Sequence, residues 1–267
     1  MDRYLLKNII IIILILVNGF LLGSLVMRQT AEYSAQRRTE QHLIELFEAD
    51  GILLNEDAIS HGTPPSPRML TADARRQTES AAFFLGNNLL EDDQGGTLSL
   101  TGSSGIARFR SGGSFEIEGK LASEDAEKLC ESFCKTFSFD PPVFELDETG
   151  SGSGFAVFRH EGLPVYNCTL TFTLKNGTLN RVNGTLLSGE STAFSPEREP
   201  LSGIAALTAF QKTRRESGAV VSSVSELYLC YELSASSGGS ILEPSWCVVT
   251  DTSKYYVNAS SGAVTSG

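Results

Sequence analysis

The chain has 267 residues, of which 41% are hydrophobic, 20% charged and 9% aromatic, so it is neither disordered nor fibrous and should build a packed core. Its 21 Lys and Arg residues against 32 Asp and Glu residues give a net charge of -11. This excess of negative charge argues against nucleic acid as a partner, and against an anionic membrane surface as a partner for the bulk of the chain.

The first predicted element is a transmembrane helix near the N-terminus. Between Lys7 and Arg28 lie 20 uncharged residues, Asn8 to Met27. At about 1.5 Å per residue, a helix of this length reaches about 30 Å, the thickness of the hydrocarbon layer. The alternative is a cleaved signal peptide. Its apolar region is typically about 7 to 15 residues long, however, and no clear cleavage site precedes Arg28.

The orientation of this span follows from its position and not from its charges. Arg3 and Lys7 stand before the span, and Arg28, Arg37 and Arg38 follow it, so the positive-inside rule leaves the orientation open. A short tail, one span and a long soluble region are the usual form of a signal anchor. We therefore expect a single-pass protein of the cell membrane with its C-terminal region outside the cytoplasm.

Four residues inside the span form a candidate partner-binding face. Gly19 and Gly23 make a Gly-x-x-x-Gly pair, Ser24 lies beside it, and Asn18 is polar at membrane depth. Small residues one turn apart let a second helix approach closely, and an amide in hydrocarbon seeks a partner. The alternative is that glycines are simply common in membrane helices.

Beyond the span, the chain predicts helices that alternate with groups of short strands. A polar helix should continue to Asp50, with Leu43, Leu46 and Phe47 as a short apolar face, before a proline-rich linker. Further helices are expected over 72–90, with an end at Asn87-Asn88 or near Gly95-Gly96, from 123 to about 137 and over 201–216, each followed by strands. This threefold pattern predicts an α+β fold in which helices pack on antiparallel sheets.

The sequence contains few signs of catalytic chemistry. The three histidines, His42, His61 and His160, have no second histidine at the spacing of zinc ligands. The sequence also has no Walker loop, no dinucleotide-binding glycine motif and no Gly-x-Ser-x-Gly elbow. Acidic runs such as Glu91–Asp93 are typical of solvated turns. We therefore expect no enzymatic activity, no metal site and no cofactor.

The five cysteines include no Cys-x-x-Cys motif. Cys130 and Cys134 lie one helical turn apart and are interpreted as small core residues. A two-residue turn at Gly238-Gly239 would place Cys230 directly opposite Cys247 across the last hairpin, as a disulfide or as two packed thiols. The alternative is a longer loop, because a proline in the second strand cannot donate to the ladder.

Several runs in the C-terminal half resemble PepSY-like domains. The run EGLPVY at 161–166, a strand, the Asn176-Gly177 turn and a second strand are similar to their central hairpin. Their closing pattern is similar to a helix over 204–214, a strand over 227–231, LEPSWCVV at 242–249 and YYVNASSG at 255–262. With the anchor in front, the chain resembles the YycI/YycH family, membrane-anchored regulators of the cell-wall-sensing histidine kinase of Gram-positive bacteria.

The resemblance implies a non-enzymatic extracytoplasmic regulator that binds a sensor histidine kinase and a YycH-like sister regulator. It leaves open whether the chain also forms a homodimer. Residues 1–28 would then be the anchor with a short cytoplasmic tail, and 29–68 a juxtamembrane helix and linker. Residues 69–120 would form a first helix-plus-strands unit, and 121–267 a PepSY-like, YycI-type region. The alternative function is a PepSY-type chaperone or inhibitor of a secreted hydrolase. An enzyme would require carboxylates or histidines that converge in a deep pocket.

Overall fold

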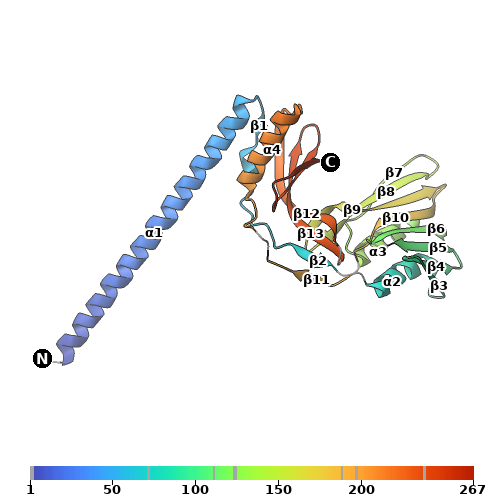
Figure 1. Cartoon of the computed structure of the whole chain (residues 1–267), viewed down its shortest axis with the longest axis horizontal. Helices are drawn as coiled ribbons and strands as arrows, with labels where there is room; N and C mark the ends of the chain where they lie inside the picture. The colour runs from blue at the N-terminus through green and yellow to red at the C-terminus, as the bar shows by residue number, and fades with distance from the viewer. Residues whose placement is uncertain are drawn as a thin grey trace.

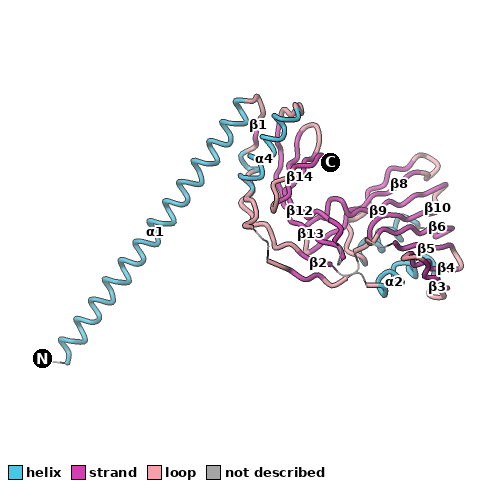
Figure 2. Tube along the Cα trace, viewed as in Figure 1, coloured by secondary structure: helices cyan, strands magenta, loops and turns pink. Residues whose placement is uncertain are grey.

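The computed structural model describes residues 3–70, 73–110, 112–122, 125–187, 189–195, 198–236 and 239–267. The side chains of residues 3–12, 15, 23, 25–26, 28–36 and 236 lie outside this description. The helices are α1 (Arg3–Ala49), α2 (Ala74–Leu85), α3 (Ala126–Thr136), α4 (Gly203–Ser217) and the 3-10 helix η1 (Glu56–Ala58). Helix α1 extends away from the folded body in Figure 1, and Figure 2 shows that this body is mostly strand.

The strands form one 15-stranded sheet. They are β1 (Leu53–Leu54), β2 (Arg68–Leu70), β3 (Leu90–Gln94), β4 (Thr97–Gly102), β5 (Gly105–Arg110), β6 (Ser114–Ala122), β7 (Val143–Leu146), β8 (Gly152–His160), β9 (Leu163–Lys175), β10 (Thr178–Thr185), β11 (Ser191–Ala193), β12 (Ser223–Ser236), β13 (Gly239–Thr250), β14 (Lys254–Asn258) and β15 (Val264–Ser266). The main path runs β11-β2-β13-β12-β9-β10-β6-β5-β4-β3, and β1, β7, β8, β14 and β15 pair beside it.

The order of elements confirms the α+β class and the threefold pattern. Helix α2 precedes β3 to β6, α3 precedes β7 to β11, and α4 precedes β12 to β15. One predicted boundary was wrong: the helix expected over 72–90 ends at Leu85, and Leu90–Gln94 forms the edge strand β3 instead. Gly86 causes this early stop, because its φ of 84° leaves the helical region.

The first core is formed mainly by the first two helix-plus-strand groups, α2 with its strands and α3 with its strands. Strands β6 and β10 pair side by side although α3, β7, β8 and β9 lie between them in sequence. Helices α2 and α3 pack their apolar faces on this part of the sheet, with Phe84, Phe133 and Phe172 among the buried rings. Phe84 and Phe133 lie 4.8 Å apart between ring centroids, and Phe133 meets Phe172 edge-on at 6.4 Å. Long-range pairing therefore merges two sequence groups into one body.

The second core lies between α4 and strands β12 to β14. Ala206, Leu207 and Phe210 of α4 pack against Trp246 and its neighbours on the sheet. Ser202 caps this helix, since its hydroxyl accepts a hydrogen bond from the amide of Ala205, and Gly218 ends it with a left-handed φ of 70°. Both caps agree with the predicted limits of the helix.

The pairing of Cys230 with Cys247 was predicted incorrectly. Cys230 lies opposite Ser245, and Cys247 lies opposite Tyr228. Ser236 pairs with Gly239 and not with Ile241 as the prediction requires, and Gly238 of the predicted turn lies outside the described residues. This register differs from the predicted one by two residues, which keeps both thiols on one face of the hairpin but places them diagonally. The two strands also continue through the position of the predicted longer loop, and all five cysteines are free and buried.

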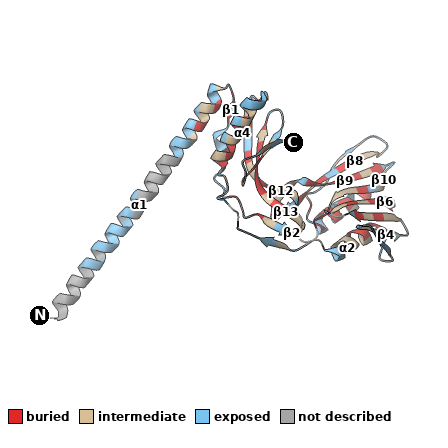
Figure 3. Cartoon of the chain, in the orientation of Figure 1, coloured by how far each residue is buried: buried red, intermediate tan, exposed pale blue. Residues whose placement is uncertain are grey.

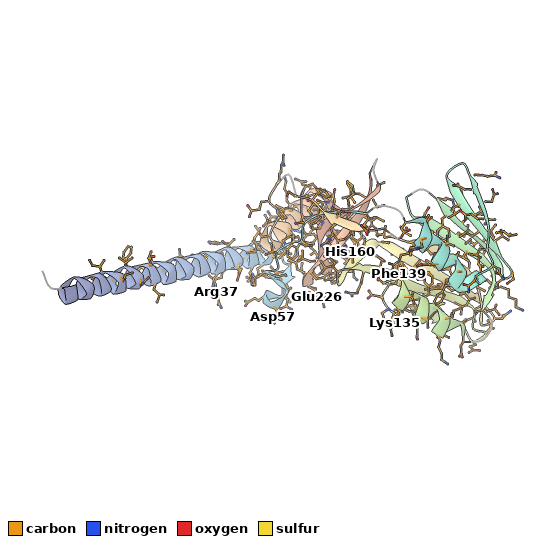
Figure 4. The ribbon with its side chains drawn as sticks, turned by 90° about the horizontal axis from the view of Figure 1, so that it is seen from below. Arg37, Asp57, Lys135, Phe139, His160 and Glu226 are labelled. Carbon is orange, nitrogen blue, oxygen red and sulfur yellow. The ribbon has the colours of Figure 1, made fainter. Side chains whose placement is uncertain are left out.

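The two cores meet at a seam between β9 and β12, where Tyr231 of β12 and Leu242 of β13 also pack into the first core. Strand β9 pairs with β12 in parallel at Val165 and Tyr231, and the amide of Asn167 extends this pairing. Its nitrogen donates to the carbonyl of Leu233 and its oxygen accepts from the Leu233 N–H, both at 2.8 Å. Figure 4 shows His160 in the region between the two bodies, and its ring lies 5.8 Å from that of Tyr231.

Candidate functional site: the N-terminal helix and its junction

The first half of α1 presents apolar side chains to the surroundings. The residues described there are between 49% and 76% exposed and comprise Ile13, Leu14, Leu16, Val17, Phe20, Leu21, Leu22 and Met27. Figure 3 shows α1 exposed along its described length until its last turns, where buried residues appear beside α4. Exposed apolar surface of this extent is a site of interaction with a membrane or with another protein.

Among the described residues, no helix combines the length and the hydropathy that a membrane crossing requires. Part of the predicted span lies outside those residues, including the side chains of Asn8 to Ile12.

The predicted partner-binding face is only partly described. Asn18, Gly19 and Ser24 are exposed, whereas Gly23 lies outside the described side chains. The Ser24 hydroxyl donates to the carbonyl of Leu21 at 2.8 Å, so it is satisfied within the helix. A Cβ atom built at Gly19 meets nothing within 4 Å. The structure therefore places three of the four residues on the helix surface, and their role in partner binding stays a prediction.

The last two turns of α1 belong to the second core. Of the predicted apolar face, Leu43 is 4% exposed and Phe47 is fully buried, whereas Leu46 is only partly buried. The rings of Phe47 and Phe210 stack with centroids 6.3 Å apart, and Ile52 packs into the same cluster just after the helix. Helix α1 and α4 are thus in direct contact, with α1 ending inside the folded body.

A polar clamp fixes the chain just beyond the end of α1. Arg214 and Arg215 of α4 both donate to the carboxylate of Asp50, with Arg215 Nε 2.6 Å from Oδ2 and Nη2 3.0 Å from Oδ1. Buried Gln211 donates to the same Oδ2 at 2.7 Å and accepts from Arg214 Nε at 2.9 Å. The hydrogen bond from Arg215, together with the charges of both arginines, outweighs burial and lowers the pKa of Asp50.

Sequence reasoning found the apolar part of this junction but missed the clamp. Leu43 and Phe47 were predicted as a buried face because they recur at helical spacing next to a polar stretch. Arg214 and Arg215 lie in the last turn of α4, where basic residues suit the negative end of the helix dipole and do not point to a distant partner. Asp50 lies 164 and 165 positions away from these partners, so nothing local in the sequence indicates the contact.

The remaining titratable groups do not form a converging metal-binding cluster within the part of the chain that the structure describes. His42 contacts Glu45 on α1, and His61 lies 3.8 Å from Glu40, whereas His160 lies at the seam. Burial raises the pKa of the Cys130, Cys134 and Cys168 thiols to about 12, so these thiols are protonated at neutral pH.

Comparison with known proteins gives few matches. Neither a family model nor a curated protein matches the sequence. An uncharacterised protein from Eubacterium rectale is 13% identical, with a TM-score of 0.45 over 80% of this chain and 89% of that chain. YycH from Bacillus subtilis is also 13% identical, with a TM-score of 0.37 over 76% of this chain. The match covers 53% of the YycH chain.

Proposed function

We propose that this chain is a non-enzymatic, membrane-anchored extracytoplasmic regulator of a cell-wall-sensing two-component histidine kinase. In this proposal it acts by protein contacts, through its span and its outer region, together with a YycH-like sister regulator. The observation that carries the proposal is the junction between α1 and α4. One uninterrupted helix of 47 residues contains the exposed apolar stretch and ends in a hydrophobic core.

The junction supports a mechanical role for α1. Phe47 is packed against α4, and Asp50 is held by Arg214 and Arg215 of the same helix. A displacement of α1 along or about its axis therefore acts on α4 and on the strands beneath it. In the proposed arrangement, the apolar half of α1 lies beside the spans of the kinase, and the outer region biases the position of the helix. The resemblance of the C-terminal half to PepSY-like and YycI/YycH proteins supports the same class of function.

Co-purification from membranes tests the proposal. The full chain, tagged at its C-terminus and extracted in mild detergent, is expected to recover a histidine kinase or a sister regulator. A matched variant replaces residues 8–27 by an unrelated apolar helix of the same length and retains everything from Arg28 onward. We expect this variant to reach the membrane, to retain its folded outer region and to lose the kinase, because helix contacts depend on specific small residues.

The same experiment separates the alternative function. A chaperone or inhibitor of a secreted hydrolase needs no specific helix, so the exchanged anchor would leave its activity intact. Recovery of neither a kinase nor a sister regulator with the native chain would contradict the proposal. Equal recovery with the exchanged anchor would assign the contact to the outer region instead of the span.

A further inference from the structure

A cavity of about 610 Å³ lies where the two bodies meet, within the size range of about 300–1,000 Å³ that is usual for ligand sites. On one side it is lined by Phe155, Val157 and Arg159 of β8. These side chains alternate along the strand with buried Ala156 and Phe158, so they lie on the face of the sheet opposite to the first core.

The other side of the cavity is formed by strands β12 to β14, by the face of the sheet opposite to α4. Tyr228 of β12 and Tyr256 of β14 line it, and both flank Cys247 of β13 in the same row of paired residues. Trp246 and Val248, the neighbours of Cys247, point into the second core under α4. The helix-covered faces therefore form the two cores, and the opposite faces meet at the cavity.

Aromatic side chains give the cavity a rigid wall across the seam. Tyr166 of β9 stacks on Tyr256 of β14 with ring centroids 3.6 Å apart and an interplanar angle of 7°. Burial raises the pKa of each of these hydroxyls to about 12, so both remain neutral donors at physiological pH. The wall thus offers aromatic surface and hydroxyl groups without adding negative charge.

The charges that line the cavity favour an anionic occupant. They are Asp140, Arg159 and Lys254. Arg159 Nε donates to Asp140 at 2.5 Å, so the only lining carboxylate among the described residues is already paired with a cation. Lys254 is exposed and takes part in no ion pair with a described residue. A protein with a net charge of -11 therefore places at this cavity an ammonium group that forms no ion pair with a described residue, although Glu226 acts on the Cys247 thiol together with Lys254.

The apolar lining continues out of the cavity to the edge of the sheet. Phe155 pairs directly with Val143 on β7, and the two side chains are 49% and 69% exposed. Among the strands that the structure describes, β7 pairs only with β8, so this apolar pair lies at a sheet edge. An occupant that covers both the cavity and this edge must be longer than a small acid, and it must present apolar groups beside its negative charge.

We propose that this cavity binds an extended segment of a partner protein in which acidic side chains alternate with leucine or phenylalanine. An acidic side chain of the segment would lie at Lys254, and its apolar side chains would cover Phe155 and Val143. The proposal goes beyond the regulatory function above, since it concerns a separate surface of the outer region and requires no kinase.

Fluorescence anisotropy with the full chain in detergent tests this site. The probe is a fluorescein-labelled, end-capped peptide Leu-Glu-Phe-Glu-Leu-Glu, and the matched peptide has every glutamate replaced by glutamine. In about 0.1 M salt, where charges are screened within about 10 Å, the acidic peptide is expected to bind and the glutamine peptide to bind at least about tenfold more weakly.

Three variants locate the binding. Lys254→Glu should weaken the acidic peptide at least about tenfold, because it places like charges together. Lys135→Glu makes the same charge change on α3. Lys135, labelled in Figure 4, does not line the cavity, so this variant should change binding less than about twofold. Phe155→Ser should weaken both peptides about tenfold through lost apolar contact. Because these side chains are exposed, all three variants should keep the circular dichroism of the native chain.

Four results would overturn the proposal. They are no binding of the acidic peptide up to about 1 mM, equal binding of the two peptides, equal effects of Lys254→Glu and Lys135→Glu, or full competition by N-acetylglutamate at the peptide's own concentration. The last result would assign the cavity to a small acid. Because the assay contains no kinase, its failure leaves the proposed function unaffected. A failure of the co-purification likewise leaves the proposed peptide site unaffected.

Discussion

The two hydrophobic cores are built alike and closed differently. Each consists of helices packed on one face of antiparallel strands. The first core is closed by α2 and α3, which lie close in sequence to the strands that they cover. The second core is closed by α4 together with the end of α1, and its polar clamp joins residues 161 positions apart. The comparison shows that α1 is a structural part of one body only, so a displacement of this helix acts on the second core first.

The largest test of this comparison replaces one buried ring in each core. Phe47→Ala and Phe133→Ala both remove a fully buried phenylalanine, and each should destabilise its core by about 3–5 kcal/mol. The single tryptophan, Trp246, lies in the second core and reports on it by fluorescence. We expect Phe47→Ala to shift the denaturation midpoint of Trp246 fluorescence, and Phe133→Ala to shift mainly the far-UV circular dichroism.

The control for this pair is the native chain, observed by both probes under the same denaturant. If each variant moves both transitions equally, the two cores unfold as one unit and the comparison fails. Hydrogen exchange distinguishes the two outcomes further, since only Phe47→Ala should deprotect amides in the last turns of α1.

Local sequence signals predicted the elements of both cores, whereas the contacts between distant segments could not be predicted. The left-handed φ angles of Asn176 and Gly177, 50° and 71°, confirm the predicted hairpin turn. The pairing of β6 with β10, in contrast, joins strands whose alternating patterns fit many partners. The predicted register of β12 and β13 was wrong because two adjacent positions in a Ser-Gly-Gly run have nearly equal propensity to form a turn.

The candidate site also has parts that local sequence signals predicted and parts that depend on contacts between distant segments. Helical spacing and hydrophobicity identified the apolar stretch of α1 and the buried face at Leu43 and Phe47. The clamp at Asp50 and the cavity at Lys254 combine residues from segments that only the folded chain brings together. Single exposed charges of this kind look like ordinary surface in a sequence, because their surroundings decide what they do.

A second test acts on the seam between the two bodies. Asn167→Ala removes both hydrogen bonds with the Leu233 backbone, which contribute about 1–2 kcal/mol in total at an exposed position. We expect the two unfolding transitions to separate further in this variant, because β9 and β12 share only one other paired position. Asn167→Asp keeps the acceptor and loses the donor, so its effect should be intermediate. An unchanged separation in Asn167→Ala would mean that β2 and β13 carry the coupling instead.

A smaller effect is expected from the clamp, and it depends on pH. Because the pKa of Asp50 is lowered in the folded chain, its contribution to stability is present above the unfolded value of about 3.9 and disappears as the pH falls through the folded value. The native chain should therefore be more stable than Asp50→Asn at pH 7, and the difference should shrink below about pH 4.

Thermal unfolding followed by Trp246 fluorescence at several pH values measures this difference. Asp147→Asn is the matched control, since the pKa of Asp147 is also lowered but by hydrogen bonds within the 147–151 turn of the first body. That variant should leave the Trp246 transition unchanged. A pH-independent difference for Asp50→Asn would show that packing, and not the charge, is the important contribution of this residue.

The smallest expected effect concerns the surface of α1 itself. Gly19→Leu adds a side chain at a position where a Cβ atom meets no described atom within 4 Å apart from the helix's own backbone, so a loss of association reports on a partner helix. Asn18→Leu removes a polar group, and polar pairing in membranes contributes only about 0.6 kcal/mol on average. A membrane two-hybrid assay should therefore rank Gly19→Leu as more damaging than Asn18→Leu, with the unaltered helix as reference. If Asn18→Leu is the more damaging change, an amide contact and not close packing holds the partner. If neither matters, these residues do not form the face that binds a partner helix, and the contribution of α1 is limited to its apolar surface and its contacts with α4.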